Sequence, residues 1–577
     1  MSTASTATIA QLWRQRCREG ADRPALRYKR GGIWSTLTWR EFLERGRAVG
    51  LAMADEGFGR GDVVSIVSDN RPEWLIVDMA AQALGCTSHG VYPGSSAGRV
   101  AQALEMAGSR IVFVENAEQL AKLLAAGEDC ARVRRIVVMQ PEGLRHVEDR
   151  RVVRFADWLT RGEELARQQP GTFDETIDAG TADAILLLAS TAGTTGPPRL
   201  AAIDHARYLQ RLHAARNWLP LETGDRLLSF VPLSQVSERL LVQSALLMNG
   251  GLVHFPESTA TVVNDLAEVA PRLLAAPSRF WERLHARTDL FMRHDAAPVA
   301  RAAYVRSLTA QPRRPWHRLL LKRVRASLGL QNMRMALVSG EQPTPDVAAW
   351  YEALDVPLFT GYTVAEMAGY CSVVPLTTAG TASDVGLELD LDISGEILVK
   401  GMGRDLAYWT RGTLHPAPSC SRGSFRTGDI GTRSAGNIRV VGRMPLHTDG
   451  AGQAMPEQVE LALRTSPYIA DAIVIMAGQQ VGRCLLMLDE EPVRRYAQER
   501  DLTFSDYASL ASHPDVLALL AEQVDQVNRR LDDSLRVKRF DIIARPLHPD
   551  DDELTPSLRL NRRVVQQNYS SLLETRP

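Results

Sequence analysis

The sequence has few lysines and few cysteines, and its charges nearly cancel. Only five of its 67 basic residues are lysines, so arginine carries almost all of the positive charge. The cysteines form no CxxC pair and have no histidine at ligand spacing, which argues against a zinc site or a disulfide framework. They are Cys17, Cys86, Cys130, Cys371, Cys420 and Cys484. A formal net charge of -1 gives no electrostatic basis for binding nucleic acid.

Targeting and membrane-spanning patterns are also missing. The N-terminal "MSTASTATIAQLWRQRCREG" has no apolar h-region, and no run reaches bilayer length. Hydrophobic residues make up 45% and charged residues 23%, which is typical of a globular protein with a sizeable core. We therefore expect a cytoplasmic enzyme or binding protein with no transmembrane segment, for which peripheral membrane contact remains open. A length of 577 residues predicts two or more domains.

Short β-rich runs alternate with helical patterns up to about Leu200. "DVVSIVSDN" (62–70) predicts a strand and "PEWLIVDMAAQALG" (72–85) a helix that stops at a glycine. Further buried strands are expected at 109–116, 135–140, 184–190, 333–340 and 396–401. Strands separated by helices predict an α/β fold, with a mostly parallel sheet covered by helices on its faces.

The pattern changes from about Gly442 onward. Two strands joined by a turn at 478–482 precede a strongly amphipathic helix at 515–533. The chain is thus expected to hold a large N-terminal domain of helix-covered sheets, residues 1–441, and a small α+β C-terminal domain, residues 442–577. The segment "TAQPRRPWHR" (309–318) is interpreted as a surface connection.

The stretch "LLLASTAGTTGPPRLAAIDH" (186–205) runs from an apolar strand into a loop rich in glycine and threonine. Backbone N–H groups and hydroxyls in such a loop can wrap a phosphate chain. The residues in question are Thr191, Gly193, Thr194, Thr195 and Gly196. Taken alone, the loop is equally well explained as a turn. His205, which follows it, has no partner in the sequence and is expected to be structural.

The loop, read as Thr191 to Leu200, resembles the T-S-G-T-T-G-x-P-K-G signature of the AMP-forming adenylating enzymes, which include acyl-CoA synthetases, adenylation domains and luciferases. Further blocks match the same family in order: "FVPLSQVSERL", "PSRFWERLHAR", "VSGEQPTP", "GYTVAE", "GEILVKG", "FRTGDIG", "GRMPLHTDGAGQAMPEQVE" and "ELTPSLRLNRRVV". The resemblance covers nearly the whole chain and is nearest to long-chain fatty-acid–CoA ligases. It implies the adenylating-enzyme fold, with a C-terminal domain that moves as a lid.

The resemblance also implies roles for particular residues. Tyr362, with Gly361 and Thr363, would lie against adenine, and Asp429 would accept hydrogen bonds from the ribose hydroxyls. Glu366, together with Thr194, would bind Mg²⁺. Arg443 would support the ribose side, while Arg199 and Arg559 stand at the two positions where the family has catalytic lysines. The plain structural alternatives are a core tyrosine at 362 and a surface ion pair between Asp429 and Arg443.

Two chemical steps follow from the resemblance. A carboxylate attacks the α-phosphorus of ATP and gives an acyl adenylate and pyrophosphate, and then a thiol, most often that of coenzyme A, takes the acyl group. The first step brings an anion to an anion, so preorganised positive charge supplies most of the rate. The implied partners are ATP, Mg²⁺, coenzyme A and a carboxylic acid, with a fatty acid as one candidate.

The sequence departs from the family pattern at several positions. Arginine keeps the charge of lysine at 199 and 559, but it is a longer, planar fork. Losing one well-placed electrostatic group typically costs about 10²–10³ in rate. Ala192, Leu200, Ala365 and Gln235 also differ from the motifs, and Pro445 in the hinge block restricts backbone rotation.

Three interpretations stay open on the sequence alone. The first is an active AMP-forming ligase of the long-chain acyl-CoA type. The second is an adenylate-forming enzyme with an unusual acid or a non-CoA acceptor. The third is a non-catalytic nucleotide- or acyl-binding relative that acts as a partner or regulator.

Overall fold

A computed structural model places most of the chain. The residues it describes are 8–144, 147–191, 198–309, 315–340, 342–376, 384–401, 406–417, 420–421, 424–434, 437–443, 456–464, 466–477, 480–529, 531, 533–547, 553, 564–565 and 568–569. By packing, the chain divides into two units. The larger holds residues 1–276, 325–340 and 356–444, and the smaller holds residues 277–324, 341–355 and 445–577.

The larger unit contains a nine-stranded sheet. Its strands, in spatial order, are β19 (Thr413–Pro416), β18 (Ala407–Thr410), β9 (Leu200–Asp204), β8 (Ile185–Ser190), β4 (Thr87–Val91), β3 (Val63–Val67), β5 (Ile111–Val114), β6 (Arg135–Val138) and β7 (Val152–Arg154). The strands from β8 to β7 are parallel, whereas β9, β18 and β19 add antiparallel strands at one edge. The expected helix-covered, mostly parallel sheet is confirmed for this part of the chain.

Two further sheets complete the larger unit. An eight-stranded sheet runs in the order β15 (Gly369–Pro375), β14 (Leu358–Val364), β13 (Met335–Ser339), β12 (Leu273–Pro277), β10 (Arg226–Leu228), β11 (Leu252–Phe255), β1 (Pro24–Arg30) and β2 (Ile33–Thr38). A five-stranded sheet holds β16 (Glu388–Leu391), β17 (Glu396–Lys400), β21 (Ser424–Ser434), β20 (Cys420–Ser421) and β22 (Asn437–Arg443).

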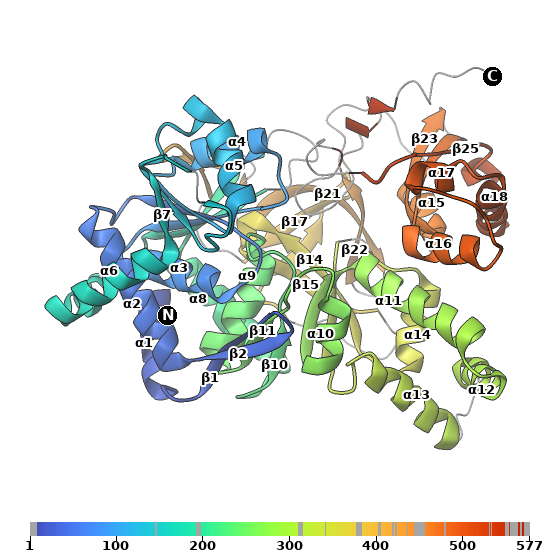
Figure 1. Cartoon of the computed structure of the whole chain (residues 1–577), viewed down its shortest axis with the longest axis horizontal. Coiled ribbons are helices and arrows are strands. Elements are labelled where there is room, and N and C mark those ends of the chain that lie inside the picture. The colour runs from blue at the N-terminus through green and yellow to red at the C-terminus, as the bar shows by residue number, and fades with distance from the viewer. Residues whose placement is uncertain are drawn as a thin grey trace. The chain divides into compact units, whose positions relative to one another are not determined.

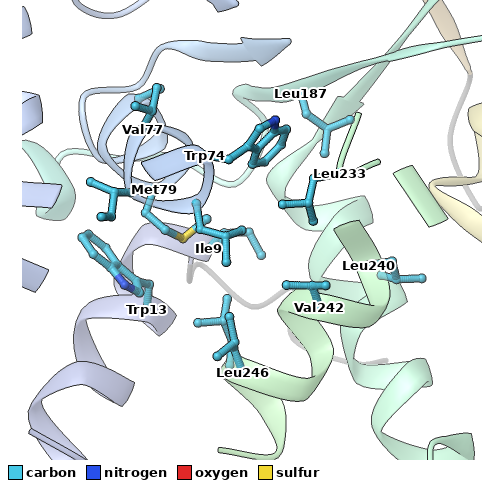
Figure 2. Close-up of a cluster of buried hydrophobic side chains, with 14 of the residues drawn as sticks. Ile9, Trp13, Trp74, Val77, Met79, Leu187, Leu233, Leu240, Val242 and Leu246 are labelled. Atoms are coloured by element: carbon cyan, nitrogen blue, oxygen red, sulfur yellow. The ribbon is translucent and has the colours of Figure 1, made fainter. Parts of the chain in front are cut away.

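Ten α-helices are described for this unit. They are α1 (Ile9–Glu19), α2 (Trp39–Asp55), α3 (Pro72–Ala83), α4 (Ala97–Ala107), α5 (Ala117–Ala125), α6 (Phe155–Gln168), α7 (Thr172–Asp178), α8 (His205–Trp218), α9 (Val236–Gln243) and α10 (Val262–Val269). Helix α2 packs between α3 and α6 (Figure 1). Figure 2 shows how side chains from α1, α3 and α9 meet in one core, with Trp13 and Trp74 fully buried. Burying one large apolar side chain stabilises the fold by about 2 kcal/mol.

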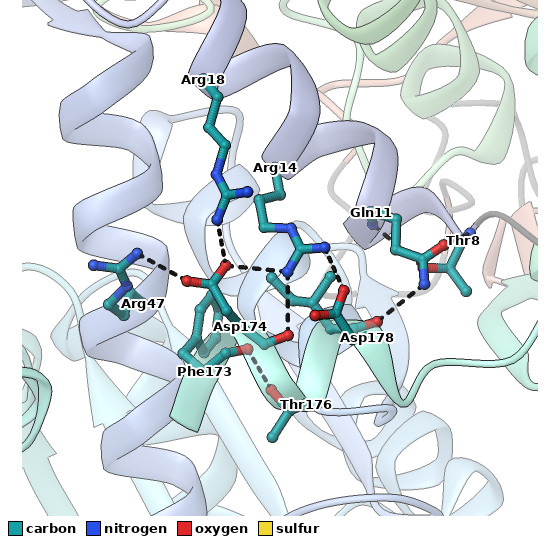
Figure 3. A network of polar contacts seen from close by, with 10 residues as sticks. Thr8, Gln11, Arg14, Arg18, Arg47, Phe173, Asp174, Thr176 and Asp178 are labelled. Atoms are coloured by element: carbon teal, nitrogen blue, oxygen red, sulfur yellow. Dashed lines mark hydrogen bonds and ion pairs between the residues drawn. The ribbon is translucent and has the colours of Figure 1, made fainter. Parts of the chain in front are cut away.

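Polar contacts hold the first helix against α7. Thr8 caps α1 in a reciprocal pair with Gln11. Arg14 bonds to Asp174 at 3.1 Å and also pairs with Asp178 (Figure 3). Arg18 reaches the same Asp174 oxygen at 3.0 Å. The carboxylate of Asp174, which both arginines share, therefore holds α1 against α7 in addition to the apolar contacts of the core.

The smaller unit combines two sets of elements. From the middle of the chain come α11 (Ser278–Leu290), α12 (Pro298–Thr309), most of α13 (Pro315–Ser327) and α14 (Pro345–Ala353). From its C-terminal part come β23 (Ile469–Ala477), β24 (Gln480–Leu488), β25 (Phe540–Ile542), α15 (Pro456–Leu463), α16 (Glu490–Gln498), α17 (Tyr507–Ala511) and α18 (Pro514–Asn528). These C-terminal helices and strands share one apolar core, which confirms an α+β arrangement (Figure 1).

Several element ends differ from the sequence-based expectation. Strand β24 begins at Gln480, inside the expected turn, because the β23–β24 pairing continues to Ala477 and Gln480. Helix α18 ends at Asn528, whose side chain exchanges hydrogen bonds of 2.9 Å with the backbone of Val537 and so turns the chain back. The division into domains 1–441 and 442–577 stays a prediction.

The segment 309–318 is not only a connection. Helix α13 begins at Pro315, so the last residues of that segment are helical, whereas residues 310–314 lie outside the described part of the chain. Proline at the first helical position needs no N–H partner and has a fixed φ that suits a helix start. The basic residues that follow therefore lie on a helix.

Candidate active site

The glycine- and threonine-rich loop leaves the sheet between β8 and β9. The N–H of Thr191 donates to the carbonyl oxygen of Arg199 at 2.8 Å, and the N–H of Arg199 donates to Thr191 Oγ1 at 3.0 Å. These two bonds close the loop at its base, so both ends have fixed positions. Gly193, Thr194, Thr195 and Gly196 lie outside the described residues, as does Ala192.

Arg199 lies beside the candidate metal-binding carboxylate, with Tyr408 between them. The guanidinium carbon of Arg199 is 5.2 Å from the centre of the Tyr408 ring, a cation–π distance. The Tyr408 hydroxyl donates to Glu366 Oε1 at 2.8 Å. Burial, followed by the charge of Glu366, raises the pKa of Tyr408, so the phenol stays protonated and keeps donating. A cation, a phenol and a carboxylate thus converge at one point.

Strand pairing brings these three residues together. Arg199 immediately precedes β9, and Tyr408 on β18 lies directly opposite Ala201 of β9. Glu366 lies in a short 3-10 turn, residues 365–367, immediately after β14. The residues come from three separate segments, so the arrangement depends on the sheet rather than on sequence proximity.

The expected adenine-side and ribose-side residues also meet. The Tyr362 hydroxyl donates to Asp429 Oδ2 at 2.6 Å. Burial and the neighbouring Asp429 charge raise the pKa of Tyr362, so this phenol also remains a donor. Gly361, the preceding residue, lies tight against Tyr370, because a Cβ at position 361 would come within 2.4 Å of the Tyr370 ring. Thr363, the next residue of β14, lies opposite Tyr370 in β15.

An irregularity in the pairing of β21 with β17 positions Asp429. The hydroxyl of Thr427 donates to the Ile397 carbonyl at 2.9 Å and accepts from the Asp429 N–H at 3.1 Å. Gly428 has a φ of +75°, a conformation that favours glycine, and its N–H donates to Glu396 at 2.9 Å. Asp429 pairs in register with Arg443 of β22, so the two positions that were expected together are neighbours across two strands.

The segment that resembles the acyl-site motif is anchored by Asn70. The Asn70 amide nitrogen donates to Ser229 Oγ at 2.8 Å and to the Val231 carbonyl at 2.7 Å, and its oxygen accepts from the Leu233 N–H at 2.8 Å. One side chain therefore holds the chain at Ser229, Val231 and Leu233, just before the motif enters α9. Gly90 of β4 permits this approach, because a Cβ there would lie 2.7 Å from the Ser234 Cα.

A buried carboxyl group and a buried ion pair lie at the start of α9. Ser229 Oγ donates to Glu238 Oε1 at 2.6 Å, and complete burial raises the pKa of Glu238 from 4.5 to about 8. Next to it, Arg239 pairs with Asp78, which also accepts from Gln82 and Gln243, each at 2.8 Å. Removing one partner of such a buried pair costs about 3–5 kcal/mol. Helix α9 is therefore held rigidly on α3.

The described residues account for much of the expected site. Arg199, which is hydrogen-bonded to Thr191, and Glu366 both contact Tyr408. Gly361, Tyr362 and Thr363 share β14, and Tyr362 is hydrogen-bonded to Asp429. Arg443 is placed only by its backbone, and Arg559 lies outside the described residues. His205 accepts from the Ile9 N–H at 3.2 Å, and burial lowers its pKa to about 4, which confirms a structural role.

Sequence reasoning missed three residues. Tyr408 lies in "DLAYWT", where nothing marks it as different from any strand tyrosine, because only strand pairing places it beside Glu366. Asn70 ends a predicted strand, and an asparagine there usually indicates a turn. Glu238 belongs to a quoted motif, but its burial cannot be read from the sequence; a charged residue inside an apolar helical pattern was the available signal.

The chain belongs to the AMP-binding enzyme family, whose model matches residues 13–415. It is similar to the long-chain-fatty-acid–CoA ligase FadD15 of Mycobacterium bovis, with 26% identity over 94% of this chain and 92% of that protein. The long-chain-fatty-acid–CoA ligase heimdall of Drosophila melanogaster is 23% identical over 99% of this chain and 95% of its own length.

The fold is shared with solved adenylation domains. The adenylation domain of a carboxylate reductase from Mycobacterium chelonae superposes with a TM-score of 0.71 at 18% identity, over 98% of this chain and 90% of that one. The expected adenylating-enzyme fold, with a large sheet domain and a smaller α+β part, is thereby confirmed.

Proposed function

We propose that this chain is an AMP-forming acid–CoA ligase acting on a fatty acid. It would join a carboxylate to AMP with release of pyrophosphate, and then transfer the acyl group to the thiol of coenzyme A with release of AMP. The relatives named above support the substrate class, because they are long-chain-fatty-acid–CoA ligases that match along nearly the whole chain.

The observation that carries the proposal is the convergence of Arg199, Tyr408 and Glu366. A cation beside a carboxylate fits the polyphosphate of ATP together with a divalent metal, since the cation contacts phosphate oxygens and the carboxylate contacts the metal. Within the described residues, no group of three or more His, Cys, Asp or Glu side chains could form a metal site. A single carboxylate suits Mg²⁺, which takes its other oxygens from phosphate and water. When bound there, Mg²⁺ would neutralise charge on the phosphates.

The chain's own residues have distinct tasks in this reaction. The Gly/Thr loop, whose base is closed by Thr191 and Arg199, would bind the phosphates through its N–H groups and hydroxyls. Tyr408 holds Glu366 in one orientation, and Asp429, oriented by Tyr362, accepts hydrogen bonds from ribose. The acid carboxylate attacks the α-phosphorus as the bond to pyrophosphate breaks, and Arg199 and Arg559 supply the positive charge that this step needs. A thiolate then attacks the acyl carbon, and AMP leaves with its electron pair.

Acid-dependent ATP–pyrophosphate exchange tests the first step. We expect exchange in the presence of Mg²⁺ with a fatty acid, and thioester formation when coenzyme A is added. Glu366→Gln should abolish both, whereas Glu268→Gln, on the surface of α10, serves as a control and should leave both unchanged. Exchange without thioester formation would point to a different acceptor. No exchange with any acid, from a protein that still binds ATP, would contradict the proposal and favour a non-catalytic binding protein.

A further inference from the structure

One segment of this nearly neutral chain is strongly basic. Residues 296–340 contain nine Arg and Lys residues and no Asp or Glu over 45 positions, although the formal net charge of the chain is -1. The segment includes α12 and α13. Such a block of one sign, within a balanced sequence, creates a local positive potential that attracts anions.

Helix α13 divides cleanly into a buried and an exposed face. His317, Leu321 and Val324 are buried. The opposite face carries two neighbouring stripes at i, i+3 and i+7: Pro315, Arg318 and Lys322 form one, and Trp316, Leu319 and Arg323 form the other. Trp316 is 44% exposed and Leu319 54% exposed. Basic and large apolar side chains therefore alternate on the outward face.

The cations on this face have no acidic partners in the part of the chain that the structure describes. Arg306 of α12 and Arg318, Lys322 and Arg323 of α13 are exposed and form no ion pair with a described residue. Elsewhere, exposed arginines are commonly paired, as Arg411 is with Glu105. On α12, which precedes α13 in the chain, Val299 is 83% exposed.

This combination fits one kind of partner. Basic residues beside an exposed tryptophan and leucine match a membrane interface, where cations meet anionic headgroups and apolar side chains enter the headgroup–acyl boundary. Nucleic acid would use the charge and stack on Trp316, but it would leave the exposed Leu319 and Val299 without a partner. No helix among the described residues is both long and apolar enough to cross a bilayer, so contact here would be made at the surface.

We propose that the exposed face of α13 binds the surface of an anionic lipid bilayer. Binding is independent of the reaction. Its use, which rests on the proposed function, is to bring the enzyme to an acid that dissolves in membranes. Each basic residue near an anionic surface strengthens binding by about fivefold, or about 1 kcal/mol.

Co-sedimentation of the full chain with lipid vesicles tests the proposal. We expect binding to vesicles of phosphatidylcholine mixed with phosphatidylglycerol, little binding to phosphatidylcholine alone, and weaker binding as salt rises. Replacing Arg318, Lys322 and Arg323 together by Gln should lower the partition coefficient by about 100-fold. Matched neutralisation of Arg132, Arg154 and Arg167, exposed on the larger unit, should change it by less than about twofold.

Trp316→Ala separates the apolar contribution from the charge. Trp316→Ala should weaken vesicle binding by a similar factor at low and at high salt, because salt does not screen an apolar contact. The triple Gln variant should lose most of its binding at low salt, where the parent protein binds best. All substituted side chains are exposed, so we expect unfolding midpoints to match the parent protein, and exchange with a short water-soluble acid should be unchanged.

Three results would contradict the proposed membrane-binding surface. They are no binding to anionic vesicles, equal binding by the triple variant and the parent protein, or binding of single-stranded RNA through these residues without vesicle binding. Vesicle binding by a protein with no exchange activity would instead uphold the surface and contradict the proposed function.

Discussion

The Tyr362 phenol donates a 2.6 Å hydrogen bond to Oδ2 of Asp429, and the two residues belong to different sheets of the larger unit. The carboxylate that is expected to meet ribose is therefore oriented by the tyrosine that is expected to meet adenine. This bond joins the two halves of the expected nucleoside site.

Tyr362→Phe keeps the aromatic face and removes the hydroxyl that makes this bond. Because hydrogen bonds to charged groups contribute about 1.5–3 kcal/mol, we expect the KM for ATP to rise by about 10-fold or more. The KM for the acid should stay the same. Steady-state kinetics with each substrate varied in turn measures both values, and an unchanged KM for ATP would show that Asp429 needs no orientation.

Tyr408 contributes a hydroxyl to Glu366 and a ring face to Arg199. Tyr408→Phe loses only the hydroxyl, and Tyr408→Leu loses both. We expect the Phe variant to need more Mg²⁺ for half-maximal exchange, and the Leu variant to show in addition a kcat lowered by about 10-fold. Magnesium titrations of pyrophosphate exchange separate these effects. If the two variants behave identically, the cation–π contact between Arg199 and Tyr408 makes no contribution to the reaction rate.

Glu238 predicts a pH dependence of stability with a definite sign. Burial raises its pKa from 4.5 to about 8 in the folded chain, so below about pH 4.5 the carboxyl is neutral in both states and its contribution is fully present. Between pH 4.5 and 8 folding takes up a proton that the unfolded chain has lost, so the contribution falls as pH rises, by about 1.4 kcal/mol for each unit of pKa shift.

Glu238→Gln keeps the shape of the side chain and cannot ionise. We expect its urea midpoint to lie close to that of the parent protein at pH 5 and clearly above it at pH 8. Buried histidines such as His89, whose pKa is lowered to about 4, act with the opposite sign in both proteins and cancel in the comparison. Parallel pH curves for the two proteins would place an ionised carboxylate at position 238.

The sequence resemblance aligns Arg559 with a position where the family has a compact lysine, and this alignment is itself a prediction. We expect Arg559→Lys to speed the adenylation step, by up to about 10²-fold, because an ammonium group fits between carboxylate and phosphate more closely than a guanidinium does. Single-turnover formation of acyl adenylate measures the step directly. An unchanged or slower rate would mean that the chain has adapted to arginine at this position.

The order of elements was largely predictable because the larger unit repeats strands and helices with clear periodicity. The strand expected at 62–70 is β3, and the helix expected at 72–85 is α3. The ends of elements were less predictable, since they depend on partners far along the chain. Asn528 stops α18 by bonding to Val537, and neither residue alone indicates a helix end.

The residues of the candidate site that lie in sequence motifs were predictable, whereas those that only strand pairing brings to the site were not. Asp429 and Arg443 are recognisable separately, and their register follows from a hairpin. Tyr408 lies more than 200 residues from Arg199 along the chain, and only the antiparallel pairing of β18 with β9 brings them together.

Strand β18 also has a consequence for how the protein is made. Before residues 407–410 emerge from the ribosome, β9 is the edge of its sheet, and its N–H and C=O groups on that side are open to any other chain. The strand that brings Tyr408 to Glu366 is the same strand that covers this edge. A product truncated before β18 would therefore lack Tyr408 and expose the edge of β9, so we expect it to be inactive and prone to aggregate. The same late-synthesised strand thus completes the candidate site and protects the sheet from pairing with other chains.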